Sequence, residues 1–141
     1  MKILGIDYGD RYVGLASCDG EEILAYPLRS VKVKRMREAV DVCAAAAAEE
    51  GVGLIVLGLP LMPDGTEGGR ASKTRAFGRV LAKVSALPVE FYDERLTTVQ
   101  AEEYLAQAGI ARKNMKKYTD AASAQIILGD YIASARRPRS I

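Results

Sequence analysis

The chain has 141 residues, of which 49% are hydrophobic and 27% are charged, and its formal net charge is +2. These values are typical of a globular protein, so we expect residues 1–141 to form one domain and exclude the fibrous and disordered classes. The sequence contains no histidine, which excludes a Ser-His-Asp triad, a histidine general base and histidine-bound zinc.

The sequence also indicates a reducing environment away from the membrane. It contains no run of about 18 apolar residues, so we expect no transmembrane helix. The first apolar segment reaches Asp7 too soon to form the core of a signal peptide. The two cysteines, Cys18 and Cys43, lack the CxxC spacing of a redox or zinc motif. We therefore expect a cytoplasmic protein.

The first three predicted elements form an antiparallel meander. Residues 2–8 and 11–18 have the composition of strands, and Gly9-Asp10 between them is typical of a tight turn. A third strand is predicted near residues 22–28.

A helix and a buried strand follow. Apolar side chains recur at helical spacing and predict an amphipathic helix from 33 to 50 that ends at Gly51; they belong to Met36, Val40, Cys43 and Ala47. The continuous apolar run 54–57 is typical of a strand that is buried on both faces of a parallel sheet.

The segment after this strand is rich in glycine. Residues 61–69 contain proline, aspartate and several glycines, which predicts a mobile loop. Apolar positions then indicate a helix over 71–84, and a strand is predicted at 89–93.

Two further helices are predicted near the C-terminus. A capping box formed by Thr97 and Gln100 starts a helix that ends at Gly109. The basic linker 110–117 follows, and the last helix starts near Thr119, with an inner side formed by Ala122, Ile126 or Ile127, and Ile132. The order of elements predicts an α/β layered domain in which parallel strands extend the meander.

Three acidic residues stand at the ends of these predicted elements. Asp7 interrupts the first strand, Glu94 follows the strand 89–93, and Asp120 lies in the first turn of the last helix. A buried carboxylate needs hydrogen-bond partners or a cation. If the three carboxylates converge, they form a site for a divalent cation, and the chemistry such a site supports is mostly phosphate-ester hydrolysis.

Each acid also has a purely structural interpretation. Asp7 could cap a hairpin turn, strand-end acids such as Glu94 are common, and Asp120 could be stabilised by the dipole of its helix. Asp93 and Glu94 are neighbours in a strand, so their side chains point to opposite faces and only one can enter the site. Asp93 is therefore an alternative to Glu94 as a metal ligand.

Many basic residues gather in three runs that contain no acid. One run alone could be a solvated loop, but three runs in a short chain favour contacts with the phosphates of nucleic acid. The runs are Arg29, Lys32, Lys34, Arg35 and Arg37; Arg112, Lys113, Lys116 and Lys117; and Arg136, Arg137 and Arg139.

Four segments resemble one bacterial family, described both as Holliday junction resolvases and as pre-16S rRNA nucleases, in the ribonuclease H-like superfamily. They are LGIDYGDRYVGLA (4–16), LIVLGLPLMPDGTEGGRA (54–71), YDERLTTVQAE (92–102) and TDAASAQIIL (119–128). They span nearly the whole chain in the family's order. The resemblance implies a ribonuclease H-like fold, with a mixed five-stranded sheet flanked by helices, and metal ligands at Asp7, Glu94 and Asp120.

The end of the fourth predicted strand departs from the wider superfamily. Many of its members carry the second acid there, where this chain has Gly58-Leu59-Pro60. If the fourth strand lies between the first and the fifth, two acidic side chains could reach inward over this small end and share metal ions.

The resemblance implies a nuclease that uses Mg²⁺ or Mn²⁺ and processes the 5′ end of pre-16S rRNA during ribosome assembly. Its partners would be structured RNA, including precursors of the small ribosomal subunit, and it could act as a monomer or a homodimer. The candidate nucleic-acid contacts are Arg11, Arg35, Arg70, Lys73, Arg95, Thr97, Lys113, Lys116 and Lys117. Tyr8 and Tyr118 could stack on bases or belong to the core.

Three alternatives stay open from the sequence. The substrate could be a four-way DNA junction, which a dimer would cut symmetrically. The chain could be an RNA-binding assembly factor without catalysis. It could also be an actin-like ATPase, because GIDYG resembles the first phosphate loop of actin-like kinases as well.

Overall fold

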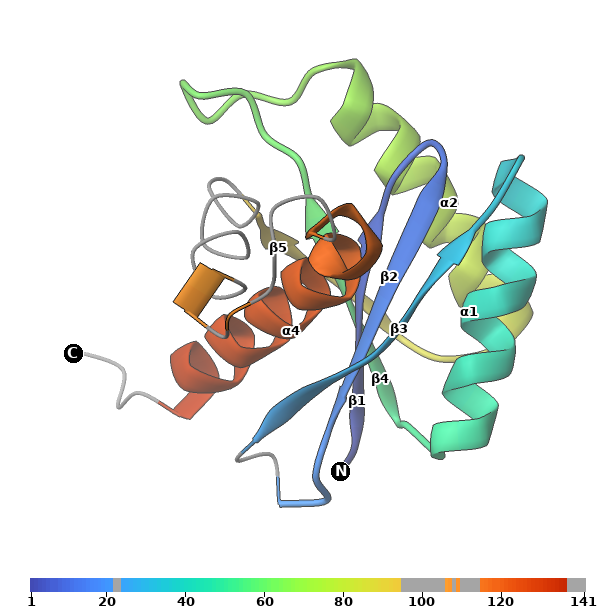
Figure 1. Ribbon diagram of the computed structural model, residues 1–141. Helices are drawn as coiled ribbons and strands as arrows, with labels where there is room; N and C mark the ends of the chain where they lie inside the picture. Colours follow the sequence, from blue (N-terminus) through green and yellow to red (C-terminus); the bar gives the residue numbers. More distant parts are fainter. Residues whose placement is uncertain (22–23, 95–105, 108, 110–114, 137–141) are drawn as a thin grey trace, which may run out of the picture.

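The computed structural model describes residues 1–21, 24–94, 106–107, 109 and 115–136. Its centre is a five-stranded sheet with the strand order β3-β2-β1-β4-β5 (Figure 1). The sheet is mixed, because its first three strands are antiparallel and its last two run parallel to β1. This is the mixed five-stranded sheet that the sequence predicts.

The strands follow the predicted order along the chain. The meander consists of β1 (Ile3–Tyr8), β2 (Tyr12–Cys18) and β3 (Ala25–Lys32). The central strand β4 (Leu54–Leu59) is buried along its whole length, as its continuous apolar sequence predicts. At the edge lies β5 (Val89–Asp93).

Helices cover both faces of the sheet. α1 (Met36–Glu50) and α2 (Gly69–Ser85) pack on one face, and α4 (Met115–Arg136) crosses the other (Figure 1). The predicted apolar stripe of α1 is confirmed, since Val40, Cys43 and Ala47 are buried and Met36 packs against the same core. Two hydrophobic clusters therefore lie on opposite sides of the sheet.

Strand β3 lies farther along the chain than predicted, because it extends to Lys32 rather than ending near residue 28. It is an edge strand, and such strands tolerate both a proline and exposed charges, here Pro27 and Arg29. Consequently α1 begins at Met36 and not at Val33, whose backbone N–H instead donates to the Arg11 carbonyl at 2.8 Å.

The last helix begins earlier than predicted. α4 starts at Met115, so the end of the predicted basic linker 110–117 is helical, and the prediction of a start near Thr119 was wrong. Lysine is a good helix former, and Thr119 resembles a cap only in sequence. Asp120 therefore lies beyond the first turn, which contains no acid. Its interpretation as a residue stabilised at the helix start no longer applies.

The helix predicted from Thr97 lies outside the described residues, apart from Ala106 and Gln107, which are helical. Gly109, its predicted end, has a φ of 81°, as expected for a helix-ending glycine. The loop 61–69 contains a small turn in which the Thr66 N–H and hydroxyl both donate to Asp64 Oδ1. Its predicted mobility stays a prediction.

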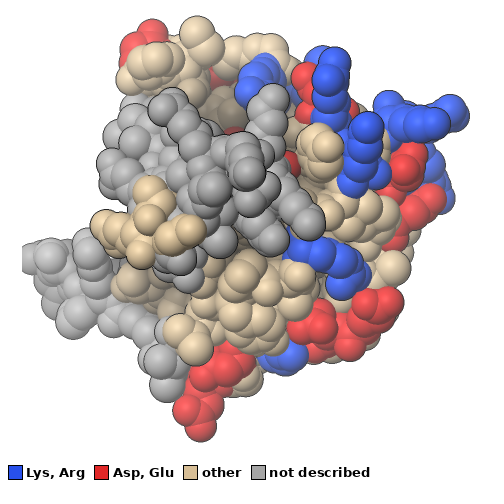
Figure 2. Space-filling model, in the orientation of Figure 1, with Lys and Arg blue, Asp and Glu red and all other residues tan. Residues whose placement is uncertain are grey.

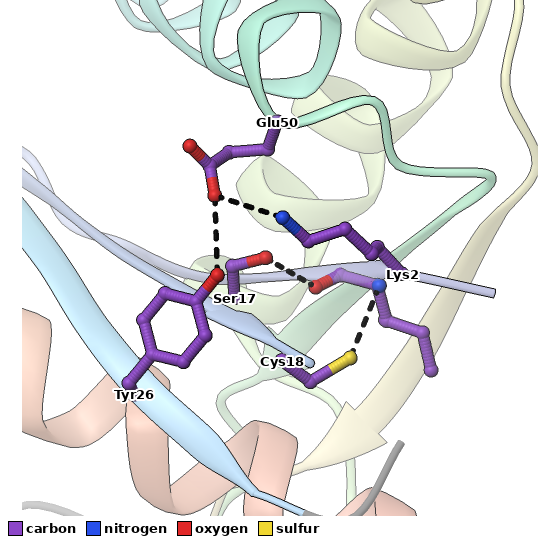
Figure 3. A network of polar contacts seen from close by, with 6 residues as sticks. Lys2, Ser17, Cys18, Tyr26 and Glu50 are labelled. Atoms are coloured by element: carbon purple, nitrogen blue, oxygen red, sulfur yellow. Dashed lines mark hydrogen bonds and ion pairs between the residues drawn. The ribbon is translucent and has the colours of Figure 1, made fainter. Parts of the chain in front are cut away.

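A polar network holds together the edge of the sheet where β1 begins. Lys2 Nζ lies 3.5 Å from Glu50 Oε1, and the Tyr26 hydroxyl donates to the same oxygen. Ser17 Oγ donates to the Ile3 carbonyl, and the Ile3 N–H donates to Cys18 Sγ. Figure 3 shows how this network joins the meander to the end of α1. Within the described part of the chain, no helix has the length and apolar character needed to cross a bilayer.

Candidate metal and nucleic-acid site

Asp7 and Glu94 meet at the edge of the sheet where the parallel strands end. Asp7 is the penultimate residue of β1, and Glu94 directly follows β5. β4 lies between these strands, and the Glu94 N–H donates to the Leu59 carbonyl at 3.2 Å. The side chains of Asp7 and Glu94 are hydrogen-bonded to each other. The two acids therefore come together across an intervening strand.

Gly58 provides the space for this contact. Ile6 pairs with Leu57 in the parallel register, so Asp7 lies beside Gly58. A Cβ atom at Gly58 would collide with Glu94 Oε2 and would lie 2.6 Å from Ile127 Cδ1. The Glu94 carboxylate thus lies directly over the glycine. This arrangement is the one expected from the small end of the fourth strand.

The structure distinguishes Glu94 from its neighbour Asp93. Successive side chains of a strand point to opposite faces of the sheet. Glu94 is half-buried on the α4 face beside Asp7, whereas Asp93 is exposed. Of the two candidates, only Glu94 is brought to Asp7.

Asp120 approaches the same region from α4. Its side chain is half-buried, and its charge raises the pKa of Asp7. Within the described ranges, no three acidic or thiol side chains are close enough to surround one ion as they stand. The site therefore consists of an Asp7–Glu94 pair in direct contact and Asp120 at longer range.

Burial dominates the electrostatics of the acids. Desolvation raises the pKa of Asp7, Glu94 and Asp120. The charge of Asp120 raises the pKa of Asp7 further, and the charges of Asp7 and Asp93 raise that of Glu94. Arg70 opposes these effects by lowering the pKa of both Asp7 and Glu94. In the absence of a cation, the pair therefore retains a proton that a solvated pair of carboxyls would lose.

Arg70 also lines a small pocket. It is lined by Tyr8, Asp10, Arg70, Lys73 and Thr74. Lys73 Nζ is 3.9 Å from Asp10 Oδ1, an exposed ion pair of little energetic weight. Arg70, whose charge acts on both Asp7 and Glu94, thus shares this pocket with a second basic residue, Lys73.

The other predicted nucleic-acid contacts are dispersed. Arg11 and Arg35 are exposed near the end of β3, and Lys and Arg side chains gather at the upper right of the face in Figure 2. Lys116 and Lys117 lie in the first turn of α4. Three predicted contacts lie outside the described residues: Arg95, Thr97 and Lys113.

Several residues proposed for nucleic acid have partners within the protein. Arg29 forms an ion pair with Glu49 at 3.4 Å, and Arg37 with Asp41 at 3.2 Å. Tyr8 stacks on the buried Phe77, with ring centroids 4.1 Å apart. Tyr8 is therefore partly buried against the core, and it also lines the pocket beside Arg70.

Sequence reasoning missed two residues that contact the backbone of Asp120. A Cβ atom at Gly14 in β2 would collide with the Asp120 carbonyl group. Ser30 Oγ in β3 accepts a hydrogen bond from the Ala121 N–H at 3.1 Å. A glycine inside a strand is a signal of close backbone approach, but a serine among basic residues gives no comparable signal.

Nearly the whole chain is similar to known proteins. The model of the family described as "RuvX: Holliday junction resolvase" matches residues 1–134. A protein of Chloroflexus aggregans is 40% identical over 98% of this chain and 97% of its own length, and one of Pelotomaculum thermopropionicum is 39% identical over 99% and 91%. Both are named "Putative pre-16S rRNA nuclease".

Two solved structures share the fold across nearly the whole chain. RuvC of Thermus thermophilus in complex with a Holliday junction has a TM-score of 0.61 and 18% identity, covering 96% of this chain and 95% of its own. The fowlpox virus resolvase in complex with Holliday junction DNA has a TM-score of 0.63 and 14% identity, covering 97% and 100%. The predicted ribonuclease H-like fold is confirmed.

Proposed function

This chain belongs to the RuvX Holliday junction resolvase family, and from that premise we propose that it is a divalent-metal-dependent nuclease with a site formed by Asp7, Glu94 and Asp120. One observation carries the assignment of the site. The Glu94 carboxylate lies over Gly58 and is hydrogen-bonded to Asp7 at the edge where the parallel strands end. A structural cap would not require two half-buried carboxyls in contact.

The donor set fits Mg²⁺ or Mn²⁺. All three side chains offer carboxylate oxygens, which these cations prefer, and the chain contains no histidine to favour zinc. A bound divalent cation would polarise the scissile phosphate and lower the pKa of the attacking water. The retained proton between Asp7 and Glu94 would leave, because ligands bind metal in their deprotonated form.

The basic residues beside the acids have a separate task. Arg70 lowers the pKa of both carboxyls, so it helps to keep them ionised, and its guanidinium can hold a phosphate in two hydrogen bonds. Lys73, one helical turn farther along α2, adds a second positive charge. Together they would orient a nucleic-acid backbone across the acids.

The substrate we propose is the 5′ extension of pre-16S rRNA, cut in the cytoplasm during ribosome assembly. The names of the two relatives support this choice. The description of the family supports a second substrate, a four-way DNA junction. Symmetrical cutting of a junction would require a homodimer, whereas single-site processing of rRNA can be performed by a monomer.

Mn²⁺-dependent cleavage of two substrates tests the proposal. Wild type and Asp7→Asn are compared on a 5′-extended pre-16S rRNA fragment and on a four-way DNA junction, with binding measured in parallel. We expect wild type to cut the rRNA, and Asp7→Asn to bind it without cutting. Preferential cutting of the junction would support the resolvase function instead. If both proteins bind RNA equally and neither cuts, the result would support an RNA-binding assembly factor. If the protein binds ATP but no nucleic acid, the result would support an actin-like ATPase.

A further inference from the structure

Asp120 belongs to a helix that lies unusually close to the sheet. A Cβ atom at Gly14 would collide with the carbonyl carbon and oxygen of Asp120 and would lie 2.8 Å from the Ala121 nitrogen. Since α4 crosses the sheet at this point (Figure 1), only a residue without a side chain can lie beneath it. The peptide group between Asp120 and Ala121 therefore rests on β2.

Ser30 holds the same peptide group from the neighbouring strand. It pairs with Gly14 across β2 and β3, and its Oγ accepts a hydrogen bond from the Ala121 N–H at 3.1 Å. Ser30 and Ala121 are 91 positions apart in the chain. The contact is therefore tertiary, and it anchors one particular turn of α4 to the sheet.

This anchor acts directly on the proposed metal ligand. A peptide group is planar and contains the Cα atoms of both residues that it joins. The contacts of Gly14 and Ser30 thus fix the plane that contains the Asp120 Cα atom. Because the Asp120 side chain is bonded to that Cα atom, a fixed peptide group limits where its carboxylate can lie.

A fixed starting point is important because Asp120 is the acid at longer range. Asp7 and Glu94 lie at strand ends in direct contact with each other, whereas Asp120 comes from a separate layer of the fold. A small rotation or shift of α4 would move Asp120 relative to the pair. Residues that orient ligands from behind usually affect metal affinity by about 10- to 100-fold.

We propose that Ser30 is a positioning residue that, with Gly14, sets Asp120 for binding a divalent cation with Asp7 and Glu94. This inference rests on the proposed function, because it assumes that these acids bind the cation. It assigns a role to a side chain that touches neither the substrate nor the reacting atoms.

The experiment measures Mn²⁺ binding directly by electron paramagnetic resonance, without substrate. We expect Ser30→Ala to weaken binding about tenfold. Ser30→Thr should bind like wild type, because it retains the acceptor oxygen. Gln125→Ala is the matched control, because Gln125 Nε2 also links α4 to β3 by donating to the Ala25 carbonyl at 3.1 Å. Gln125 lies more than one helical turn beyond Asp120, so this contact does not involve the peptide group between Asp120 and Ala121.

Three results would overturn the inference. Wild-type affinity in Ser30→Ala would show that the hydrogen bond does not position Asp120, and the proposed metal site would still stand. An equal loss of affinity in Gln125→Ala would show general loosening of α4. If Asp7→Asn bound Mn²⁺ as wild type does, the acids would not form the site, and both the inference and the proposed function would fall.

Discussion

Glu94 reaches Asp7 across Gly58, a residue of the intervening strand that has no side chain. The strand order explains this requirement, because β4 separates the two strands that carry the acids. A larger residue on this face of β4 would occupy the space of the Glu94 carboxylate. The absence of a side chain at Gly58 is therefore as much a part of the site as the acids themselves.

Replacement of Gly58 should disable the site. In Gly58→Ala the new methyl group would meet both Glu94 and Ile127. We expect the Mn²⁺ concentration for half-maximal cleavage to rise about tenfold or more, and overpacking to lower the free energy of unfolding by about 1–3 kcal/mol. Metal titrations of cleavage and chemical denaturation measure these two effects.

Gly129→Ala provides the control for this substitution. Gly129 lies in α4, and a Cβ atom there would have no neighbour within 4 Å among the described residues. Alanine in a helix interior is favoured over glycine by about 0.5–1 kcal/mol. This variant should be slightly more stable and equally active. A similar defect in both variants would show that the effect of Gly58→Ala does not come from its contact with Glu94.

The metal-free protein should lose stability as the pH rises. Burial raises the pKa of Asp7 and Glu94, for Glu94 to about 9, so the folded state binds protons more tightly than the unfolded state. The contribution of such groups is complete below the unfolded pKa of about 4 and is lost as the pH passes the folded pKa. The free energy of unfolding should therefore fall between about pH 4 and pH 9.

Asp7→Asn should weaken this pH dependence. It removes one of the two buried charges, so at pH 8 it should stabilise the metal-free protein by about 1–3 kcal/mol, since each unit of pKa shift corresponds to about 1.4 kcal/mol. Denaturation curves in a chelator from pH 5 to 9 measure the effect. A flat profile in wild type, or a less stable variant at pH 8, would disagree with this prediction.

Arg70 should contribute to both substrate binding and ionisation. In Arg70→Gln the slope of log affinity for rRNA against log salt concentration should become shallower by about one unit. The acid limb of the pH–rate profile should move to higher pH, because Arg70 lowers the pKa of Asp7 and Glu94. Arg79→Gln, about 13 Å farther along α2, should change neither quantity, and equal effects in both variants would count against a local role.

Ser123 provides a test of the packing of α4. Its hydroxyl is buried and has no hydrogen-bond partner among the described residues. An unpaired buried hydroxyl is costly, so Ser123→Ala should raise the free energy of unfolding by about 1 kcal/mol. Denaturation of the two proteins at the same pH measures the difference, and a destabilised variant would indicate a partner for the hydroxyl.

The sequence predicted the layers of the fold because their signals are local. The stripe of α1 and the apolar run of β4 are periodicities that read directly as a helix and a buried strand. The start of α4 was missed because Thr119 and Asp120 resemble a cap, while the preceding residues are also compatible with a helix. Local preferences alone do not decide between two such starts.

The site was predictable where strand geometry determines it. Strands β1 and β5 end at the same edge, which predicts that Asp7 meets an acid at the end of β5, and the alternation of side chains predicts that only one of Asp93 and Glu94 does so. The choice of Glu94 came from the structure. The roles of Gly14 and Ser30 depend on how α4 crosses the sheet. That crossing is a tertiary arrangement, and its one sign in the sequence is the glycine inside β2, because Ser30 gives no comparable signal.

The most direct test of the central claim compares Glu94→Gln with Asp93→Asn in Mn²⁺-dependent cleavage of the 5′-extended pre-16S rRNA fragment. The two substitutions remove the same charge from adjacent residues whose side chains lie on opposite faces. We expect Glu94→Gln to lower the cleavage rate by about 100-fold or more and Asp93→Asn to cut like wild type. Full activity in Glu94→Gln, or an equal loss in Asp93→Asn, would contradict this prediction.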